Sequence, residues 1–290
     1  METFIQLTIN GLSNGAILAL AALGFVLIYK ATGVINFAQG EFLLIAGFVI
    51  WFMLVEVGSP WFVGVGVAIV VAIALGLVIE RVILRPMVGQ PVISVIMVTI
   101  GLSAVLGAIV QIIWGTRPRA FPEFIPAGSV ELFGATVPEN RLWAIGIVAV
   151  ALAGFTTFYS RSREGIAMRA VADDQQAALA QGISLRRTFA LAWALAGVSA
   201  VFGGALVTNL VGVSGAISSF GLLVFPVVIV GGLDSVGGAV AGGAIIGLLS
   251  SYTGGYVGGG LETVIPYMAL LAILLVRPYG LFGQTRIERV

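Results

Sequence analysis

The stretch Phe4–Tyr29, FIQLTINGLSNGAILALAALGFVLIY, decides the fold class of this chain, because it contains no Asp, Glu, Lys or Arg. A helix that crosses the hydrocarbon layer needs about 20 mostly apolar residues. The first basic residue is Lys30, so no basic region of the kind that opens a secretory signal precedes the run. We expect it to be a retained first membrane span.

The whole composition agrees with this first span. Of the 290 residues, 59% are apolar and 9% are charged, whereas soluble chains are about 45–50% apolar and about 25% charged. Further apolar segments are continuous rather than alternating with period two, which excludes an outer-membrane barrel. They are 34–55, 61–79, 92–114, 142–159, 188–211, 217–232, 236–253 and 263–277.

The sequence therefore predicts an all-α fold, a polytopic transmembrane helix bundle with about 8–10 spans. Our preferred count is about nine, and residues 1–290 form a single transmembrane domain. The last three segments are short and rich in glycine, so we expect some broken or re-entrant helices among them. Pro226 in the middle of 217–232 favours a kinked or interrupted helix.

Basic residues give the orientation, because Lys and Arg concentrate in cytoplasmic loops. They gather at Lys30, in the 80–91 loop, in the 161–187 segment and in a tail with Arg277, Arg286 and Arg289. With alternating spans these places share one side, which puts the N-terminus outside and the C-terminus in the cytoplasm. The long loop 115–141, which also carries Glu123, Glu131 and Glu139, then lies on the extracytoplasmic side, with modest structure.

Several kinds of chemistry are excluded by residues that the chain lacks. It has no Cys and no His, which removes thiol chemistry, Cys/His zinc sites and Ser-His-Asp triads. Its one Lys, Lys30, does not end a Walker A motif, so the chain is not its own P-loop ATPase. A net charge of +1 gives no basic surface for nucleic acid. We expect no cofactor, no metal and no enzymatic activity.

The longest polar stretch on the predicted inner side is SRSREGIAMRAVADDQQAALAQGISLRR, residues 160–187. Its Ala, Leu, Arg and Gln content predicts two short helices, 165–172 and 174–181. Asp173 or Asp174 can cap the second helix, and Gly182 can end it in a left-handed conformation. Such a segment suits docking into a groove of another protein, although it could also lie on lipid headgroups.

Within this stretch, Gln176–Gly182 (QAALAQG) resembles the Glu-Ala-Ala-x-x-x-Gly signature of importer-type ABC permeases, with Gln176 in place of the glutamate. Four other stretches resemble the branched-chain amino-acid permeases of that class, most closely the first of the two permeases. They are NGLSNGA (10–16), GVINFAQGEF (33–42), GGLDSVGGA (231–239) and RPYGLFG (277–283).

The resemblance implies a permease domain that moves branched-chain or hydrophobic amino acids inward by alternating access in a bacterial inner membrane. It implies two separate ATP-binding subunits as partners, a second homologous permease and an extracytoplasmic substrate-binding protein. It also implies that 161–187 is the coupling segment, with contacts to the ATPase from Glu164, Arg169, Asp173, Gln176, Ala177, Ala178 and Gly182. Permeases for urea or short amides share this fold and remain the first alternative. An ion-coupled secondary transporter is less favoured, and Glu41 and Asp234 are its candidate ion ligands.

Polar residues within the apolar segments are candidates for the translocation path. Gln6, Asn10, Ser13 and Asn14 recur on one face of the first span, where they either line the path or bond neighbouring helices. Thr208 and Asn209 are candidates in the sixth span. The pairs Gly203–Gly204, Gly231–Gly232, Gly237–Gly238 and Gly242–Gly243 are expected to serve helix packing.

A second polar group opens the second span and consists of Asn36, Gln39 and Glu41. Glu41 lies about 10 Å into this span if the helix begins near Val34. A carboxylate inside a membrane is a functional candidate by default. The alternative is a structural one, in which Glu41 bonds the positive N-terminal end of its own helix.

Overall fold

The computed structural model describes residues 1–122, 124–126, 128–132 and 134–283. Turns of different pitch extend α2 to Glu56 and α3 to Met87. The elements are α1 (Glu2–Thr32), α2 (Gln39–Trp51), α3 (Trp61–Ile79), α4 (Val92–Trp114), β1 (Ser129–Leu132), β2 (Ala135–Pro138), α5 (Glu139–Arg161), α6 (Arg163–Asp173), α7 (Gln175–Ala180), α8 (Leu185–Val211), α9 (Ala216–Leu222), α10 (Val224–Gly231), α11 (Val236–Tyr256) and α12 (Leu261–Val276).

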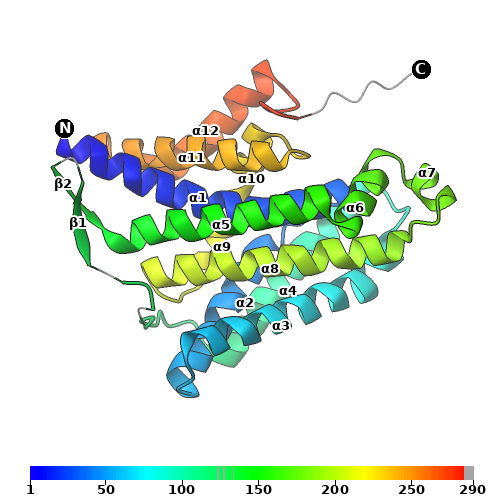
Figure 1. Cartoon of the computed structure of the whole chain (residues 1–290), viewed down its shortest axis with the longest axis horizontal. Coiled ribbons are helices and arrows are strands. Elements are labelled where there is room, and N and C mark those ends of the chain that lie inside the picture. The colour runs from blue at the N-terminus through cyan, green and yellow to red at the C-terminus, as the bar shows by residue number, and fades with distance from the viewer. Residues whose placement is uncertain (123, 127, 133, 284–290) are drawn as a thin grey trace.

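The predicted all-α bundle is confirmed (Figure 1). In the described part of the chain, seven helices are long and apolar enough to cross a membrane, and two shorter apolar stretches, 216–231 and 261–276, accompany them. The expected break near Pro226 is present, because α9 ends at Leu222 and α10 begins at Val224. Pro226 lacks the N–H that would bond to the Leu222 carbonyl, so α9 cannot continue through it.

The predicted start of the second span is wrong. We expected a helix from Val34, but α2 begins at Gln39 and residues 33–38 are not helical. Hydropathy cannot distinguish a helix from an unwound segment here, because Val34 and Ile35 are apolar residues in both cases. The unwound segment shapes the site described below.

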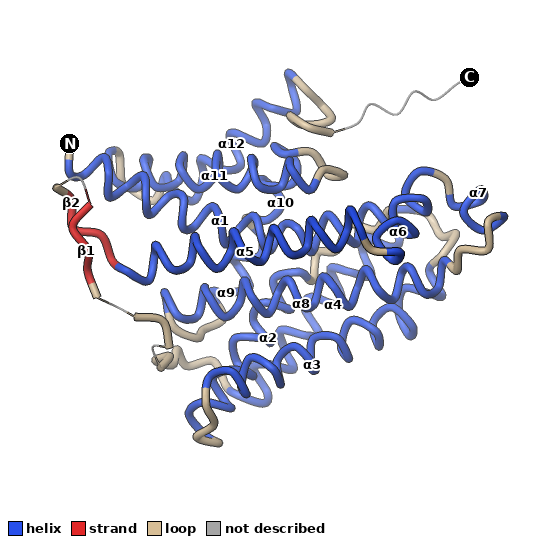
Figure 2. The backbone as a smooth tube through the Cα atoms, viewed as in Figure 1, coloured by secondary structure: helices blue, strands red, loops and turns tan. Residues whose placement is uncertain are grey.

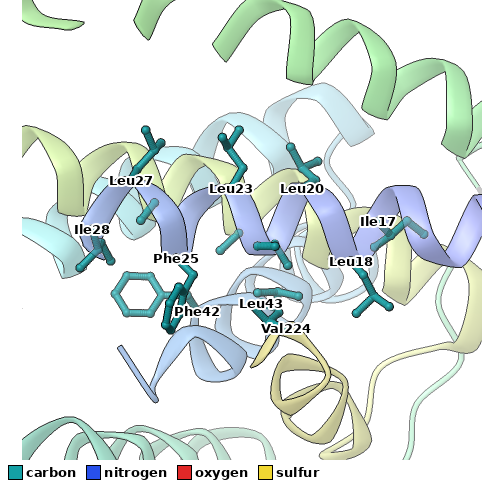
Figure 3. Close-up of a cluster of buried hydrophobic side chains, with 14 of the residues drawn as sticks. Ile17, Leu18, Leu20, Leu23, Phe25, Leu27, Ile28, Phe42, Leu43 and Val224 are labelled. Carbon is teal, nitrogen blue, oxygen red and sulfur yellow. The ribbon is translucent and has the colours of Figure 1, made fainter. Parts of the chain in front are cut away.

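Helix α1 is the centre of the bundle and contacts α5, α8, α10 and α11. Most of its residues from Ile17 to Ile28 are fully buried, and their side chains point to all sides of the helix (Figure 3). A helix that is apolar all round suits only such a buried position. Helices α3, α4 and α5 instead present many exposed apolar side chains, among them Val70, Ile112 and Val150.

Glycines bring α1 and α11 into backbone contact. A Cβ atom at Gly15 would overlap the carbonyl of Gly243, and one at Gly247 would overlap the carbonyl of Gly11. Close approach through small residues is a main source of helix association in lipid, where burial of apolar surface gives little driving force. The predicted packing role is confirmed for at least one member of every glycine pair, since a Cβ would overlap neighbouring backbone at Gly204, Gly231, Gly232, Gly238, Gly242 and Gly243. A Cβ at Gly237 would meet open space.

The loop 115–141 contains a short hairpin, which fits the modest structure that we expected. Strands β1 and β2 form an antiparallel hairpin, with register from Ser129 opposite Pro138 to Leu132 opposite Ala135. In Figure 2 this hairpin lies beside the N-terminus, at the end of the bundle opposite α6 and α7. We call these two ends the hairpin end and the α7 end. Helix α5 already begins at Glu139, while Glu123 lies outside the described residues.

The basic segments gather at the α7 end, as the orientation argument requires. The Lys30 ammonium lies 5.6 Å from the centre of the Tyr159 ring, close to where α5 ends. Glu80, Arg85, Leu179 and Arg186 line one cavity, so the 80–91 loop adjoins α7. Of the basic tail only Arg277 can be placed, because Arg286 and Arg289 lie outside the described residues.

Replacing Gly243 with alanine should destabilise the bundle, because the new methyl group would overlap the Gly15 backbone. Overpacking of this kind costs about 1–3 kcal/mol. The apparent melting temperature of the detergent-purified chain should therefore fall. Gly237→Ala, in the same helix but facing open space, is the matched control and should melt like wild type. Equal melting of the two variants would contradict close α1–α11 packing.

Candidate functional site

The unwound segment between α1 and α2 obtains its hydrogen bonds from neighbouring side chains. Gly33 ends α1 in a left-handed conformation, φ 71°. The Asn36 Oδ1 accepts the Ala38 N–H at 3.0 Å, and its Nδ2 donates to Gln39 Oε1 at 3.2 Å. The Thr99 hydroxyl of α4 donates to the Ile35 carbonyl at 3.0 Å. Non-helical backbone is tolerated inside an apolar layer only where protein or a water-filled cavity satisfies it in this way.

The segment turns into the interior of the bundle. The first residue of α2 therefore lies beside the middle of the bundle, next to Gly24, and not beside the end of α1. A Cβ at Gly24 would lie 2.7 Å from Gln39 Nε2, so these residues are neighbours. Gly24 precedes Thr32, the last residue of α1, by about 12 Å along the helix. Gln39 is fully buried, and its Nε2 has no hydrogen-bond partner in the described part of the molecule.

The second interruption, between α9 and α10, lies against the first. Gly221 near the end of α9 and Gly40 in the first turn of α2 are so close that a Cβ at Gly221 would overlap the Gly40 backbone. The Phe37 ring stacks on Phe225 of α10, with 4.4 Å between centroids. Phe225 also meets Phe25 of α1 edge to face at 5.3 Å. Two broken elements, distant in sequence, thus form one junction inside the bundle.

Glu41 lies at this junction with only 6% of its surface exposed. Its Oε1 accepts a hydrogen bond from Ser103 of α4 at 2.8 Å, and its Oε2 accepts one from Ser218 of α9. Glu41 occupies the first turn of α2, and the unwound segment carries that turn inward. Among the described residues no Lys or Arg forms an ion pair with it. The carboxylate is thus bonded to two neutral hydroxyls on two other helices.

A cavity of about 310 Å³ opens beside this carboxylate, between α2, α4 and α9, and ligand pockets start at roughly this size. Gly115, Thr116 and Gly215 line it where the chain leaves α4 and approaches α9. Its polar lining residues include Glu41, Ser103, Gln111, Thr116 and Ser218, and its apolar ones include Leu44, Phe48 and Val110. This arrangement can accommodate a small molecule with a polar and an apolar end.

The polar face of α1 lies elsewhere. Gln6 donates to the Thr136 carbonyl at 3.0 Å, and Asn14 accepts a hydrogen bond from Arg141 at the start of α5. These contacts tie α1 to the hairpin end, as the helix-bonding alternative expects. Asn10 is half-buried between them, and the Ser13 hydroxyl is buried without a partner among the described residues.

The side chains of Thr208 and Asn209 differ in their hydrogen bonding. The Thr208 hydroxyl donates to the carbonyls of Gly204 and Ala205 in its own helix, at 2.8 and 3.0 Å. Both amide atoms of Asn209 are enclosed without a partner in the described structure. Neither residue belongs to the cavity lining. The structure therefore bonds Asn36 to Gln39 and places Glu41 in the cavity lining, while Asn10, Asn14, Asn36, Gln39, Thr208 and Asn209 lie outside that lining.

Sequence reasoning missed Ser103 and Ser218, the two donors to Glu41. A buried carboxylate needs hydrogen-bond donors, so hydroxyls on other spans were the signal to look for. The sequence could not say which serines they are, because they lie 62 and 177 residues from Glu41. It also gave no sign that Phe37 and Phe225 would meet.

At the α7 end, the predicted pair of short helices is confirmed as α6 and α7. Asp174 caps α7 by accepting the N–H groups of Gln176 and Ala177 at 2.8 and 2.9 Å. Gly182 follows α7 with φ 81° and donates to the Leu179 carbonyl, and Ile183 donates to the Ala178 carbonyl. These two bonds form a Schellman motif.

The seven residues that the resemblance assigns to coupling do not share one face. Glu164, Asp173, Gln176, Ala177 and Gly182 are exposed. Ala178 is instead buried against Val171 and Phe189. Arg169 donates to the carbonyls of Tyr159 and Ser160, where its charge favours the C-terminal end of α5. Ala178 and Arg169 therefore hold the segment onto the bundle, and the exposed residues face outward.

Comparisons with known proteins agree over nearly the whole chain. The family model described as "Branched-chain amino acid transport system / permease component" matches residues 7–275. The chain is 31% identical to the high-affinity branched-chain amino acid transport system permease protein LivH of Salmonella typhimurium and of Escherichia coli K12, over 99% of this chain and 98% of each relative. It is 28% identical to the corresponding permease protein BraD of Pseudomonas aeruginosa, with the same coverage.

The family model covers far more than half of the chain, and the relatives are aligned almost end to end. The unwound segment, the broken α9–α10 pair and the α6–α7 segment all lie within the matched residues. This chain belongs to the family of permease components of branched-chain amino acid transport systems.

Proposed function

We propose that this chain is one membrane-spanning subunit of an ATP-binding-cassette importer that moves branched-chain or hydrophobic amino acids inward. Two separate ATPase subunits would power alternating access, and a second, homologous permease would complete the membrane part. An extracytoplasmic binding protein would deliver the substrate at the hairpin end. The chain itself would be a transport subunit without ATPase activity, in the inner membrane of a bacterium.

One observation carries the proposal, namely the exposed, doubly capped helix α7 at the end of the bundle where the basic segments gather (Figure 1). Capping by Asp174 and the Schellman motif hold this six-residue helix in place despite its shortness. Its outward side includes Gln176, Ala177 and Leu179, a small surface with one apolar anchor. A short helix of this kind suits a groove on a partner protein.

The basic residues at the α7 end also support the proposed orientation in the membrane. With the α7 end in the cytoplasm, Lys30, the 80–91 loop, the 161–187 segment and Arg277 satisfy the positive-inside rule together. The hairpin end and the N-terminus then face the extracytoplasmic side. The coupling segment 161–187 and the loop 115–141 would thus lie on opposite sides of one permease domain.

The decisive experiment is gentle detergent purification, identification of the co-purifying subunits and reconstitution of the complex into proteoliposomes. We expect two ATPase subunits, and leucine uptake that requires ATP and persists when an ionophore dissipates ion gradients. Uptake that collapses with the ionophore while ATP stays high would indicate a secondary transporter. Uptake of urea or acetamide instead of leucine would indicate the urea and amide alternative.

Leu179→Glu should disrupt the ATPase contact without unfolding the chain, because this side chain is 52% exposed. Loss of a central apolar anchor weakens an interface by about 2 kcal/mol or more, or roughly thirtyfold. ATPase recovery in pull-downs and leucine uptake should both fall. Val130→Glu, an exposed apolar position at the hairpin end, is the control for the pull-down and should recover the ATPase like wild type. Wild-type ATPase recovery by Leu179→Glu would refute docking at α7, and wild-type uptake by a variant that no longer binds the ATPase would refute the ATP-driven importer.

The absence of native cysteine allows a direct test of orientation. A single cysteine at Ser129 in β1 should react with a membrane-impermeant maleimide in intact spheroplasts. A single cysteine at Gln175 in α7 should react only after the membrane is opened. Both positions are exposed, so a difference in labelling reports sidedness. The reverse pattern would place the α7 end outside.

A further inference from the structure

Glu41 is a buried carboxylate with neutral partners only. Its two oxygens accept hydrogen bonds from the Ser103 and Ser218 hydroxyls, and among the described residues no cation pairs with it. A charge held away from water is costly unless it is paired and hydrogen-bonded. Hydroxyl donors meet only the second requirement. The carboxylate can therefore gain further stabilisation from a cationic group that reaches it.

The cavity beside Glu41 leaves such a group room. Gly107 of α4 faces the carboxylate, and a Cβ at this position would lie 3.5 Å from Glu41 Oε1. Ser103, Gly107 and Gln111 follow each other at intervals of four on α4, so they form one face of the cavity wall. Leu44 and Phe48 of α2 add apolar surface to the lining. The cavity thus combines one anionic point with an apolar wall.

We propose that Glu41 binds the α-ammonium group of the amino acid as it passes through the membrane, while Leu44 and Phe48 contact its hydrophobic side chain. This inference rests on the proposed transport function and adds the recognition chemistry. An ammonium group carries three donors and a full positive charge, so it forms charge-assisted hydrogen bonds with a carboxylate. Urea and short amides carry no such charge. The site therefore selects amino acids within the substrate range of this fold.

The competing interpretation is that Glu41 only ties α2, α4 and α9 together. Glu41→Gln separates the two, because glutamine removes the charge but can still bond both serines: its oxygen accepts from one hydroxyl, and its NH2 donates to the other, which can rotate to accept. Gly107→Val separates them in a second way. It leaves the carboxylate in place and fills the space beside Oε1. If Glu41 is only a structural tie, neither substitution should change which ligands bind.

The experiment uses the assembled transporter with a single reporter cysteine at Gln111. This residue is exposed and lines the cavity without bonding to Glu41. The rate of modification by a charged methanethiosulfonate is read on this chain after separation from its partners. Three probes share the same apolar chain. They are L-leucine, 3-methylbutylamine, which lacks the carboxylate, and 4-methylpentanoate, which lacks the ammonium group.

We expect leucine and 3-methylbutylamine to slow the modification, and 4-methylpentanoate to leave it unchanged. Glu41→Gln and Gly107→Val should each weaken protection by leucine roughly tenfold or more, the range for losing a hydrogen bond to a charged group. Glu56→Gln, at the far end of the same helical stretch, and Gly101→Val, in open space on α4, are matched controls. Both should protect like wild type.

Equal protection by 4-methylpentanoate would overturn the proposal, as would unchanged protection in the Glu41→Gln variant. If that variant fails to assemble, Gly107→Val decides the matter with the carboxylate intact. The proposal is also refuted if none of the three probes slows the modification. ATP-dependent leucine uptake by the wild-type complex is measured separately, so the transport function can stand when this recognition site fails.

Discussion

An unpaired backbone N–H or C=O in an apolar layer costs several kcal/mol, and this constraint shapes the interior of the bundle. The chain interrupts its helices at 33–38 and again at Leu223, and both interruptions lie at one junction. There Asn36 and Thr99 supply hydrogen bonds to the unwound backbone. Because α2 begins only at Gln39, Glu41 lies in the first turn of that helix, beside the cavity. The irregular backbone and the candidate site are therefore neighbours in the fold.

Close backbone packing holds that junction in place. Lipid tails are as apolar as leucine, so helices in a membrane gain stability from tight contact rather than from apolar burial. Backbone contacts at Gly15 with Gly243, Gly197 with Ala72, and Gly204 with Leu43 fix α1 and α8 against their neighbours. Gly221 against Gly40 does the same for the broken elements themselves. These glycines are therefore helix-packing positions.

The sequence predicted those features that depend on local or one-dimensional signals. Spans follow from continuous hydropathy, and the ends of α7 follow from Asp174 and Gly182, whose capping is local. The start of α2 could not be predicted, because apolar residues have the same hydropathy in a helix and in an unwound segment. Ser103 and Ser218 could not be assigned to Glu41, because only the tertiary fold brings three distant segments together. The burial of Ala178 likewise depends on Phe189, which lies in the next helix.

Helix α8 connects the two sites that the structure singles out. It begins directly after the α7 segment, extends about 40 Å, and ends just before α9, which carries Ser218. It packs along α1, α2 and α3. One continuous helix and a short loop with Gly212 and Gly215 at its ends thus connect α7 to the helix that carries Ser218. Coupling between two sites requires an element whose conformation both sites influence. Under the proposed function, the α9–α10 break would be that element for an ATPase at α7 and a substrate at Glu41.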